Sequence, residues 1–176
     1  PAEIDKLPLA ERFSRRVILK VSRIEKVEVH PSGSFLYILT LNTGDSEPRQ
    51  IVSSIVNFYK PEELLGKNIV LVYNLKPANF RGVRSNGMLL AASDPAVSDK
   101  ETCEVIFAPQ FEVGTILEPE GFDVPDDAGE MCFVKADKFA EMNLCTADGF
   151  VCVDGKKIGA NGTFLTAELY KNGKVK

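Results

Sequence analysis

The sequence holds a single histidine, His30, and this scarcity limits the catalytic and metal sites that the chain can build. A site with several histidine ligands is impossible, and a Ser/His or Cys/His catalytic pair would have to use that one residue. His30 precedes Pro31 in a segment typical of a turn, where we expect a structural role. No glycine loop of the phosphate-cradling type is present. We therefore expect a binding protein that is not an enzyme and needs no cofactor.

The four cysteines are too widely spaced to form a familiar metal or redox motif. They are Cys103, Cys132, Cys145 and Cys152, at successive separations of 29, 13 and 7 positions. Zinc knuckles and redox pairs instead place two cysteines with only two residues between them. The sequence therefore predicts reduced, mostly buried thiols and no bound metal.

Long hydrophobic runs are also missing. No window approaches the roughly 18 consecutive apolar residues that a membrane span requires, and the chain is 44% apolar and 26% charged, as in ordinary globular domains. The chain begins at Pro1 rather than at a methionine and shows no signal-peptide pattern. We expect a fragment of a longer polypeptide with a cytoplasmic location and no membrane association.

Charge is distributed unevenly along the chain. Residues 1–93 hold 13 lysines and arginines against 9 acidic residues, whereas residues 94–176 hold 8 against 16, and the net charge is −4. Because the Debye length is about 8 Å at physiological salt, acids on a distant face would barely weaken a local basic groove. We expect a polyanion to meet the first half while the second half is turned away. The alternative is a solvated acidic surface that has no partner.

Five apolar runs in the first half, with a helical signal between the third and the fourth, predict a small barrel. The expected strands cover residues 17–29 (bent near Ser22), 35–41, 49–55, 68–73 and 88–92. A starting proline, early acids and a final glycine predict a short helix over 61–66. This is the element order of an OB-fold. We therefore expect an all-β fold, with a five-stranded OB-fold barrel over residues 15–95 and a polar lead-in segment over residues 1–14.

The second half, residues 96–176, predicts a separate β-rich unit. Its expected strands cover residues 104–108, 114–117, 131–134, 150–153 and 164–170. Glycines and acids separate these runs, and no internal repeat is visible. We expect this C-terminal extension to pack on the barrel.

Residues 74–93 are the most informative stretch, because a basic loop without a single acid lies there between two apolar runs. Lys76, Arg81 and Arg84 can each meet a phosphate, since no neighbouring acid competes for them. In an OB-fold this segment is the loop between strands four and five, a usual nucleic-acid contact. The sequence predicts that this loop binds RNA, and a merely solvated loop is the alternative.

Weaker candidates surround the loop. Asn57, Ser85 and Asn86 could hydrogen-bond ribose hydroxyls or base edges, although asparagine and serine in turns often bond their own backbone. Lys20 and Arg23, on the first strand, could widen the basic groove.

Two aromatic residues share one face of the second predicted strand. Tyr37 and Phe35 could stack on unpaired bases there. Packing inside the barrel is the alternative for both.

Residues 74–93 also resemble the tRNA-binding domain of bacterial tRNA-binding proteins, of methionyl-tRNA synthetase C-termini and of endothelial-monocyte-activating polypeptide II. The pattern is Asn-Leu-Lys-Pro-Ala-x-x-Arg-Gly-Val-x-Ser-x-Gly-Met-Leu-Leu-Ala-Ala-Ser. Supporting pieces occur in the family's order at His30-Pro31, Leu36-Tyr37, 49–57 and 61–64. The resemblance is clear over residues 15–95 and weaker at 114–119 and near the C-terminus.

The resemblance implies a noncatalytic OB-fold domain that binds tRNA by structure more than by sequence. Such domains act as cofactors or appended domains of aminoacyl-tRNA synthetases, or as anchors in multi-synthetase complexes. In the polypeptide II subfamily a C-terminal extension imitates the second subunit of the dimeric bacterial protein. The resemblance therefore also implies a monomer with a pseudo-dimer interface.

Departures from the family pattern favour an alternative function. Asn79 and Phe35 stand where the family often has lysine. Losing two phosphate contacts of about five could lower affinity for RNA by roughly one to two orders of magnitude at physiological salt. The alternative is a protein-interaction or cytokine-like domain that anchors a synthetase complex, with weak or lost tRNA binding.

Overall fold

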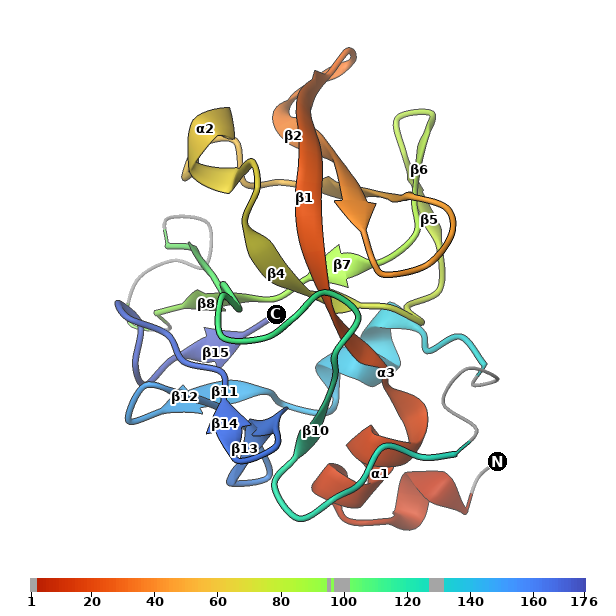
Figure 1. The fold of residues 1–176 in the computed structure, drawn as a ribbon, viewed down its shortest axis with the longest axis vertical. Coiled ribbons are helices and arrows are strands. Elements are labelled where there is room, and N and C mark those ends of the chain that lie inside the picture. The colour runs from red at the N-terminus through yellow and green to blue at the C-terminus, as the bar shows by residue number, and fades with distance from the viewer. Residues whose placement is uncertain (1–2, 95, 97–101, 127–131) are drawn as a thin grey trace.

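The computed structural model describes residues 3–94, 96, 102–126 and 132–176, which are mostly β-structure (Figure 1). The helical segments are η1 (Ile4–Lys6), α1 (Leu9–Arg16), α2 (Pro61–Leu64) and α3 (Ala136–Ala140). Strands of the first half are β1 (Leu19–His30), β2 (Gly33–Asn42), β3 (Arg49–Ser53), β4 (Asn68–Val72), β5 (Ala78–Phe80), β6 (Val83–Ser85), β7 (Met88–Leu89) and β8 (Ala91–Ser93). Strands of the second half are β9 (Glu104–Val105), β10 (Ile116–Pro119), β11 (Cys145–Ala147), β12 (Phe150–Val153), β13 (Lys156–Ala160), β14 (Thr163–Phe164) and β15 (Lys174–Val175).

The long bent first strand is confirmed as β1. Its first half pairs with β4, while its second half pairs with β2, which continues into β3. The register shifts between Ile24 and Lys26, slightly beyond the bend predicted at Ser22. Because a bulge bends a strand and increases its twist, this one lets β1 serve both neighbours and curls the sheet toward a barrel.

The predicted fifth strand is broken at Leu90 into β7 and β8. β7 pairs with β4 as an OB-fold requires, whereas β8 pairs with β9 and β15. Within the described residues, β3 and β7 share no strand ladder, so the barrel stays open there. Hydrogen bonds from β3 to residues 84–86 bridge the gap, among them Asn86 N–H to the Gln50 carbonyl at 2.9 Å and Val52 N–H to Ser85 Oγ at 2.9 Å.

The short helix predicted between the third and fourth strands is confirmed as α2. Pro61 occupies its first turn, and the Lys60 N–H donates to the Glu63 carboxylate at 2.9 Å, which caps the helix start. Gly66 follows the helix with a φ of 80°. A left-handed residue at that place ends the helix at little cost because glycine has no Cβ.

Strand β4 and the first half of β1 lie between two cores. In β4, Ile69 and Leu71 point into the barrel core, whereas Val70 and Val72 point into a second core. The second core also contains residues from α1, β10, β12, β13 and β15, so the second half covers the outer face of the barrel. A second half packed on the barrel is what the sequence led us to expect. The boundaries at residues 14 and 95 stay predictions.

The second half continues the sheet in the order β10, β13, β12, β11, β15, β8. The prediction of a strand over 164–170 is wrong beyond Phe164, where the chain turns and makes only an isolated bridge at Thr166. Of the strand predicted over 131–134, residue 131 lies outside the described residues, and Val134 forms a single bridge to Leu75.

The lead-in segment contains α1, which the sequence analysis did not predict. The helix follows Pro8, and it buries Ala10 and Phe13, of which Phe13 belongs to the second core. Leu9, Ala10 and Phe13 stand at helical spacing, a signal that could have revealed it. The N-terminal region is therefore tied to the second half of the chain.

Candidate nucleic-acid interface

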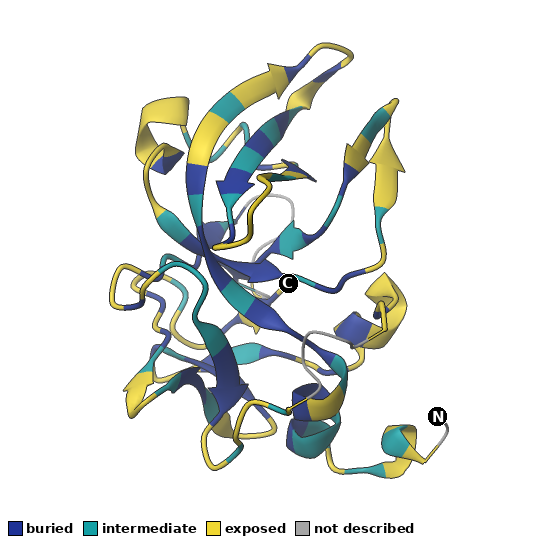
Figure 2. Cartoon of the chain, turned by 45° about the vertical axis from the view of Figure 1, so that its right-hand side comes forward, coloured by how far each residue is buried: buried dark blue, intermediate teal, exposed yellow. Residues whose placement is uncertain are grey.

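The basic loop contains a hairpin that the sequence analysis did not predict. β5 and β6 pair antiparallel around the two-residue turn Arg81-Gly82. Both turn residues have positive φ angles, 49° and 88°, as in the type I′ turns that join tightly paired strands. Glycine adopts a positive φ without a steric penalty, whereas for the arginine this conformation costs a small amount of free energy. The hairpin projects from the barrel with most of its residues exposed (Figure 2).

The hairpin and its base present three exposed cations. Within the part of the chain that the structure describes, no carboxylate lies within 4.0 Å of the charged groups of Lys76, Arg81 or Arg84. Arg81 Nη1 donates to the Ser32 carbonyl at 2.6 Å, and Arg84 Nε donates to Asn86 Oδ1 at 3.0 Å. These bonds orient the two guanidinium groups without neutralising them.

The cations on β1 differ from those of the hairpin, because each of them has an acidic partner. Lys20 Nζ lies 3.1 Å from Asp45 Oδ1, and its side chain is only 15% exposed. Arg23 Nε lies 3.6 Å from Glu25. The structure therefore keeps Lys20 and Arg23 near acids, whereas the hairpin cations remain available for an anion.

An open groove of about 880 Å³ runs beside the hairpin. Its floor contains Arg49, whose guanidinium carbon lies 3.8 Å from the centroid of the Tyr73 ring. Arg49 Nη1 also donates to the carbonyl groups of Tyr73, at 2.5 Å, and Asn86, at 3.3 Å. Arg84 and Asn86 line one side of the groove. Arg49 therefore connects β3 to both ends of the basic segment, a role that its position within a predicted strand did not reveal.

Asp45 stands at the edge of this groove as a carboxylate. Burial alone would raise the pKa of Asp45, but hydrogen bonds from Tyr73, Thr43 and Lys20 outweigh burial and lower the pKa to about 2. The Tyr73 hydroxyl donates to Asp45 at 2.6 Å, and the Thr43 hydroxyl donates at 2.7 Å. Asp45 thus holds Lys20 and Tyr73 in place rather than facing the groove with a free charge.

The remaining predicted site residues have mixed positions. Ser85 is buried, and its hydroxyl accepts from Val52 N–H and donates to the Gly87 carbonyl. Asn86 is half-buried in the groove wall. Asn57 is exposed in the turn after β3, beyond the end of the strand opposite Arg49.

Tyr37 does not lie on the surface. Its ring is buried in the barrel core, and its hydroxyl donates to the Tyr59 carbonyl at 2.7 Å. Phe35 is exposed instead, because β2 is irregular between its pairings at Gly33 and Tyr37. The structure therefore supports the packing alternative for Tyr37 and leaves no ring face for a base.

His30 fastens the hairpin tip to the barrel. The ring is buried, Ser32 N–H donates to Nδ1 at 2.9 Å, and Nε2 lies 2.8 Å from the Phe80 carbonyl. Because Nδ1 accepts a hydrogen bond, the ring proton resides on Nε2 and is donated to Phe80. The structural role expected for His30 is confirmed.

Asn74 fixes the base of the loop and was missed by the sequence analysis. Its Oδ1 accepts from Ile18 N–H at 2.9 Å, and its Nδ2 donates to the carbonyls of Arg16, at 2.8 Å, and Cys132, at 3.0 Å. Next to it, Leu75 forms a parallel bridge with Val134. Residues 132–135 of the acidic second half therefore lie beside the basic loop, so that half is not wholly turned away as predicted.

The residues that the structure describes form no helix long and apolar enough to cross a membrane. Nor do they contain a cluster of three histidine, cysteine or carboxylate side chains suited to a metal ion. The cysteines within these ranges are unpaired thiols, and only Cys152 is buried, so the prediction of mostly buried cysteines is wrong.

Comparison with known proteins agrees with this geometry. Residues 19–116 match the family described as "Putative tRNA binding domain". The chain is 37% identical to the methionine–tRNA ligase of Treponema denticola over 178 aligned positions, which cover 97% of the chain and 22% of that protein. It is also 37% identical to the methionine–tRNA ligase of Borrelia hermsii, covering 93% of the chain and 19% of that protein. The chain spans about a fifth of the length of the curated relatives it matches.

Solved structures extend the similarity to both halves of the chain. The C-terminal domain of Plasmodium vivax p43 superposes with a TM-score of 0.79 and 28% identity, over 92% of this chain and 98% of that one. A methionyl-tRNA synthetase-related protein of Pyrococcus horikoshii has a TM-score of 0.51 and 35% identity, over 57% of this chain and 88% of its own. With more than half of its length matched by a family of noncatalytic binding domains, the chain belongs to the tRNA-binding domain family.

Proposed function

We propose that this chain is the tRNA-binding domain appended to a methionyl-tRNA synthetase, acting in the cytoplasm, and that it holds the tRNA backbone through the β5–β6 hairpin. The observation that carries the proposal is a set of three exposed cations that have no acidic partner among the described residues: Lys76 at the base of the hairpin, and Arg81 and Arg84 on it. His30 and Arg49 hold this hairpin in place. Guanidinium and ammonium groups held in this way are suited to phosphate oxygens.

The groove beside the hairpin provides room for a backbone segment. Arg84 and Asn86 both line it. Arg84 could therefore bind a phosphate while Asn86 hydrogen-bonds the adjacent ribose. Asn57 would contact RNA only if the tRNA extends past the far end of β3. Ser85 and Tyr37 support the site from within, while Lys20 and Arg23 contribute less because of their acidic partners.

A single copy of the chain is sufficient in this proposal. The second half covers the outer face of β1 and β4 with a shared apolar core, which supports a monomer whose extension takes the place of a second subunit. This pseudo-dimer interface stabilises the barrel that carries the hairpin.

The proposal is tested by titrating the intact chain with bulk tRNA and with an unstructured RNA of similar length, across a salt series. We expect tRNA to bind more tightly, with a logarithmic salt slope near −2 to −3, because each of three phosphate contacts contributes roughly 0.7 to 0.9. Absence of tRNA binding even at low salt would contradict the proposal.

A second candidate function rests on an apolar groove of about 490 Å³ in the second half. Met88, Phe139, Leu144 and Val175 line it, together with Ala140. Such a groove is suited to binding a protein partner. The candidate partner is the rest of a synthetase. Ala140→Glu should then weaken association with a synthetase that lacks this domain, and it should leave tRNA affinity unchanged.

A further inference from the structure

Phe133 is an exposed aromatic residue in an unexpected place. Its side chain is 64% exposed, and it lines the groove that also contains Arg84 and Asn86. It belongs to the acidic second half, yet the backbone of residues 132–135 is hydrogen-bonded to the base of the basic loop. A large apolar ring left in water in the same groove as Arg84 offers a flat surface for a nucleobase.

The strand-like pairing of this segment brings two cations together. Val134 N–H donates to the Asn74 carbonyl and Lys76 N–H donates to the Val134 carbonyl, each at 2.8 Å, which sets the register of a parallel bridge. Leu75 and Val134 are both buried, and the next residue of each segment, Lys76 or Lys135, is exposed, so we infer from the register of the bridge that the two lysines lie opposite each other. Neighbouring like charges repel each other unless an anion lies between them.

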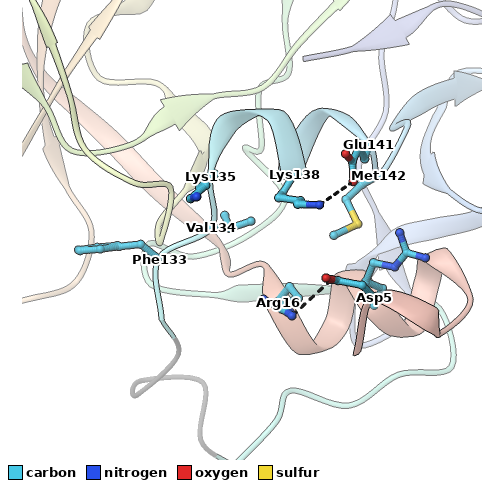
Figure 3. A pocket seen from close by; sticks show the side chains of 9 residues that line it. Asp5, Arg16, Phe133, Val134, Lys135, Lys138, Glu141 and Met142 are labelled. Atoms are coloured by element: carbon cyan, nitrogen blue, oxygen red, sulfur yellow. Dashed lines mark hydrogen bonds and ion pairs between the residues drawn. The ribbon is translucent and has the colours of Figure 1, made fainter. Parts of the chain in front are cut away.

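A small pocket of about 190 Å³ adjoins Phe133 and Lys135 (Figure 3). Two other cations of its lining are paired with acids: Lys138 Nζ lies 3.6 Å from Glu141, and Arg16 lies 3.3 Å from Asp5. Lys135, in contrast, has no carboxylate within 4.0 Å in the described ranges. Phe133 and Lys135 flank the buried Val134 and therefore share the exposed face.

We propose that Phe133 stacks on an unpaired base of the bound RNA while Lys76 and Lys135 hold an adjacent phosphate, so that the second half of the chain completes the binding face. This inference rests on the proposed function, and it assigns to that function a requirement for an unstacked nucleotide. Phosphate contacts would supply the salt-dependent part of the affinity, and the ring would supply a part that does not depend on salt.

Substitutions separate the two contributions. Phe133→Ala should weaken binding of bulk tRNA by about fivefold or more without changing the salt slope, since stacking is worth about 1 to 3 kcal/mol per base. Lys135→Ala should instead reduce the slope by roughly 0.7 to 0.9. Leu169→Ala, an exposed apolar residue at 71%, and Lys156→Ala, an exposed lysine of β13, are controls that should bind like the unmodified chain.

Fluorescence gives a direct readout, because the chain contains no tryptophan. In Phe133→Trp the emission should be quenched when tRNA binds, and it should not be quenched by a fully paired RNA duplex of similar length. In the control Leu169→Trp, binding of tRNA should leave the emission unchanged. If the unmodified chain binds tRNA and the hairpin variants weaken it, yet Phe133→Ala binds normally and Phe133→Trp is not quenched, this inference is wrong while the proposed function stands. If the unmodified chain does not bind tRNA at all, both are overturned.

Discussion

His30 donates a hydrogen bond from Nε2 to the carbonyl of Phe80, 50 residues further along the chain, and so fastens the hairpin tip to the turn between β1 and β2. The same turn accepts a bond from Arg81 through the Ser32 carbonyl. The cation at the hairpin tip is therefore positioned by two contacts to one turn. Since a contact fixed in advance costs less entropy on binding, this pair of residues links the fold to RNA affinity.

His30→Ala should destabilise the domain by about 1 to 2 kcal/mol, because a buried hydrogen-bonded group is lost and the Phe80 carbonyl loses its donor. It should also weaken tRNA binding although residue 30 contacts no RNA. His30→Asn separates the two roles: its short side chain can still accept from Ser32 N–H but cannot reach Phe80. Thermal unfolding and tRNA titration of both variants provide the check. Equal tRNA affinity for the unmodified chain and both variants would show that the hairpin needs no fastening.

Asn74→Ala should cost about 2 to 3 kcal/mol of unfolding free energy, because it removes three hydrogen bonds and leaves the Ile18 N–H without its acceptor. Asn74→Asp should not restore stability, since a carboxylate cannot donate to two carbonyl oxygens. Asn42→Ala, which removes a single exposed bond to Gly44 N–H, is the control and should cost less than about 1 kcal/mol. Urea denaturation measures all three. If Asn74→Ala lowers the free energy of unfolding by no more than Asn42→Ala does, the role given to the Asn74 side chain is contradicted.

Two glycines of the basic segment should differ in their tolerance of alanine. Gly87 has a φ of 144°, and a Cβ there would lie 2.7 Å from Leu71 Cδ1 and 3.0 Å from the Val72 carbonyl oxygen. Gly82 has a φ of 88° but open space around it. Gly82→Ala should therefore cost about 1 kcal/mol from backbone strain alone. Gly87→Ala should cost at least about 2 kcal/mol, because overpacking against β4 adds to the strain. Similar unfolding midpoints for the two variants would argue against the close packing of Gly87 on β4.

Glu118 should make stability depend on pH. Burial raises the pKa of Glu118 to about 7, against a smaller opposing effect of a hydrogen bond from Ser14. Its folded-state pKa exceeds the unfolded value near 4.5, so the folded chain binds more protons between these values and loses stability as pH rises from about 4.5 to about 7. Glu118→Gln should flatten this dependence and stabilise the domain at pH 8 by about 1 to 2 kcal/mol. Unfolding curves at pH 5 and pH 8 test this. If the free energy of unfolding of the variant falls as steeply between pH 5 and pH 8 as that of the unmodified chain, other groups cause the pH dependence.

Much of the barrel could be predicted from the sequence because local signals and tertiary packing agree there. Strands β1 to β4 combine alternating or continuous apolar residues with clear turns, and α2 begins with proline and acids. The β5–β6 hairpin escaped prediction because its residues are polar and exposed, so its formation depends on the turn at Arg81-Gly82 and on contacts to β3.

The candidate site was only partly predictable for a similar reason. Charge and sequence neighbours indicated Lys76, Arg81 and Arg84, whereas the ion pair that occupies Lys20 depends on Asp45, 25 residues away. Phe133 was overlooked because its neighbourhood in the sequence is acidic. Only the bridge between Leu75 and Val134 brings it to the basic groove.

The central claim, that the hairpin cations hold the tRNA backbone, is tested most directly by the salt dependence of tRNA binding to Arg81→Ala/Arg84→Ala beside the unmodified chain. The account predicts weaker binding and a logarithmic slope smaller in magnitude by roughly 1.4 to 1.8, because two phosphate contacts are lost. Circular dichroism should show an unchanged fold, since neither side chain is part of a core. An affinity and slope identical to those of the unmodified chain would contradict the account and remove the hairpin from the binding site.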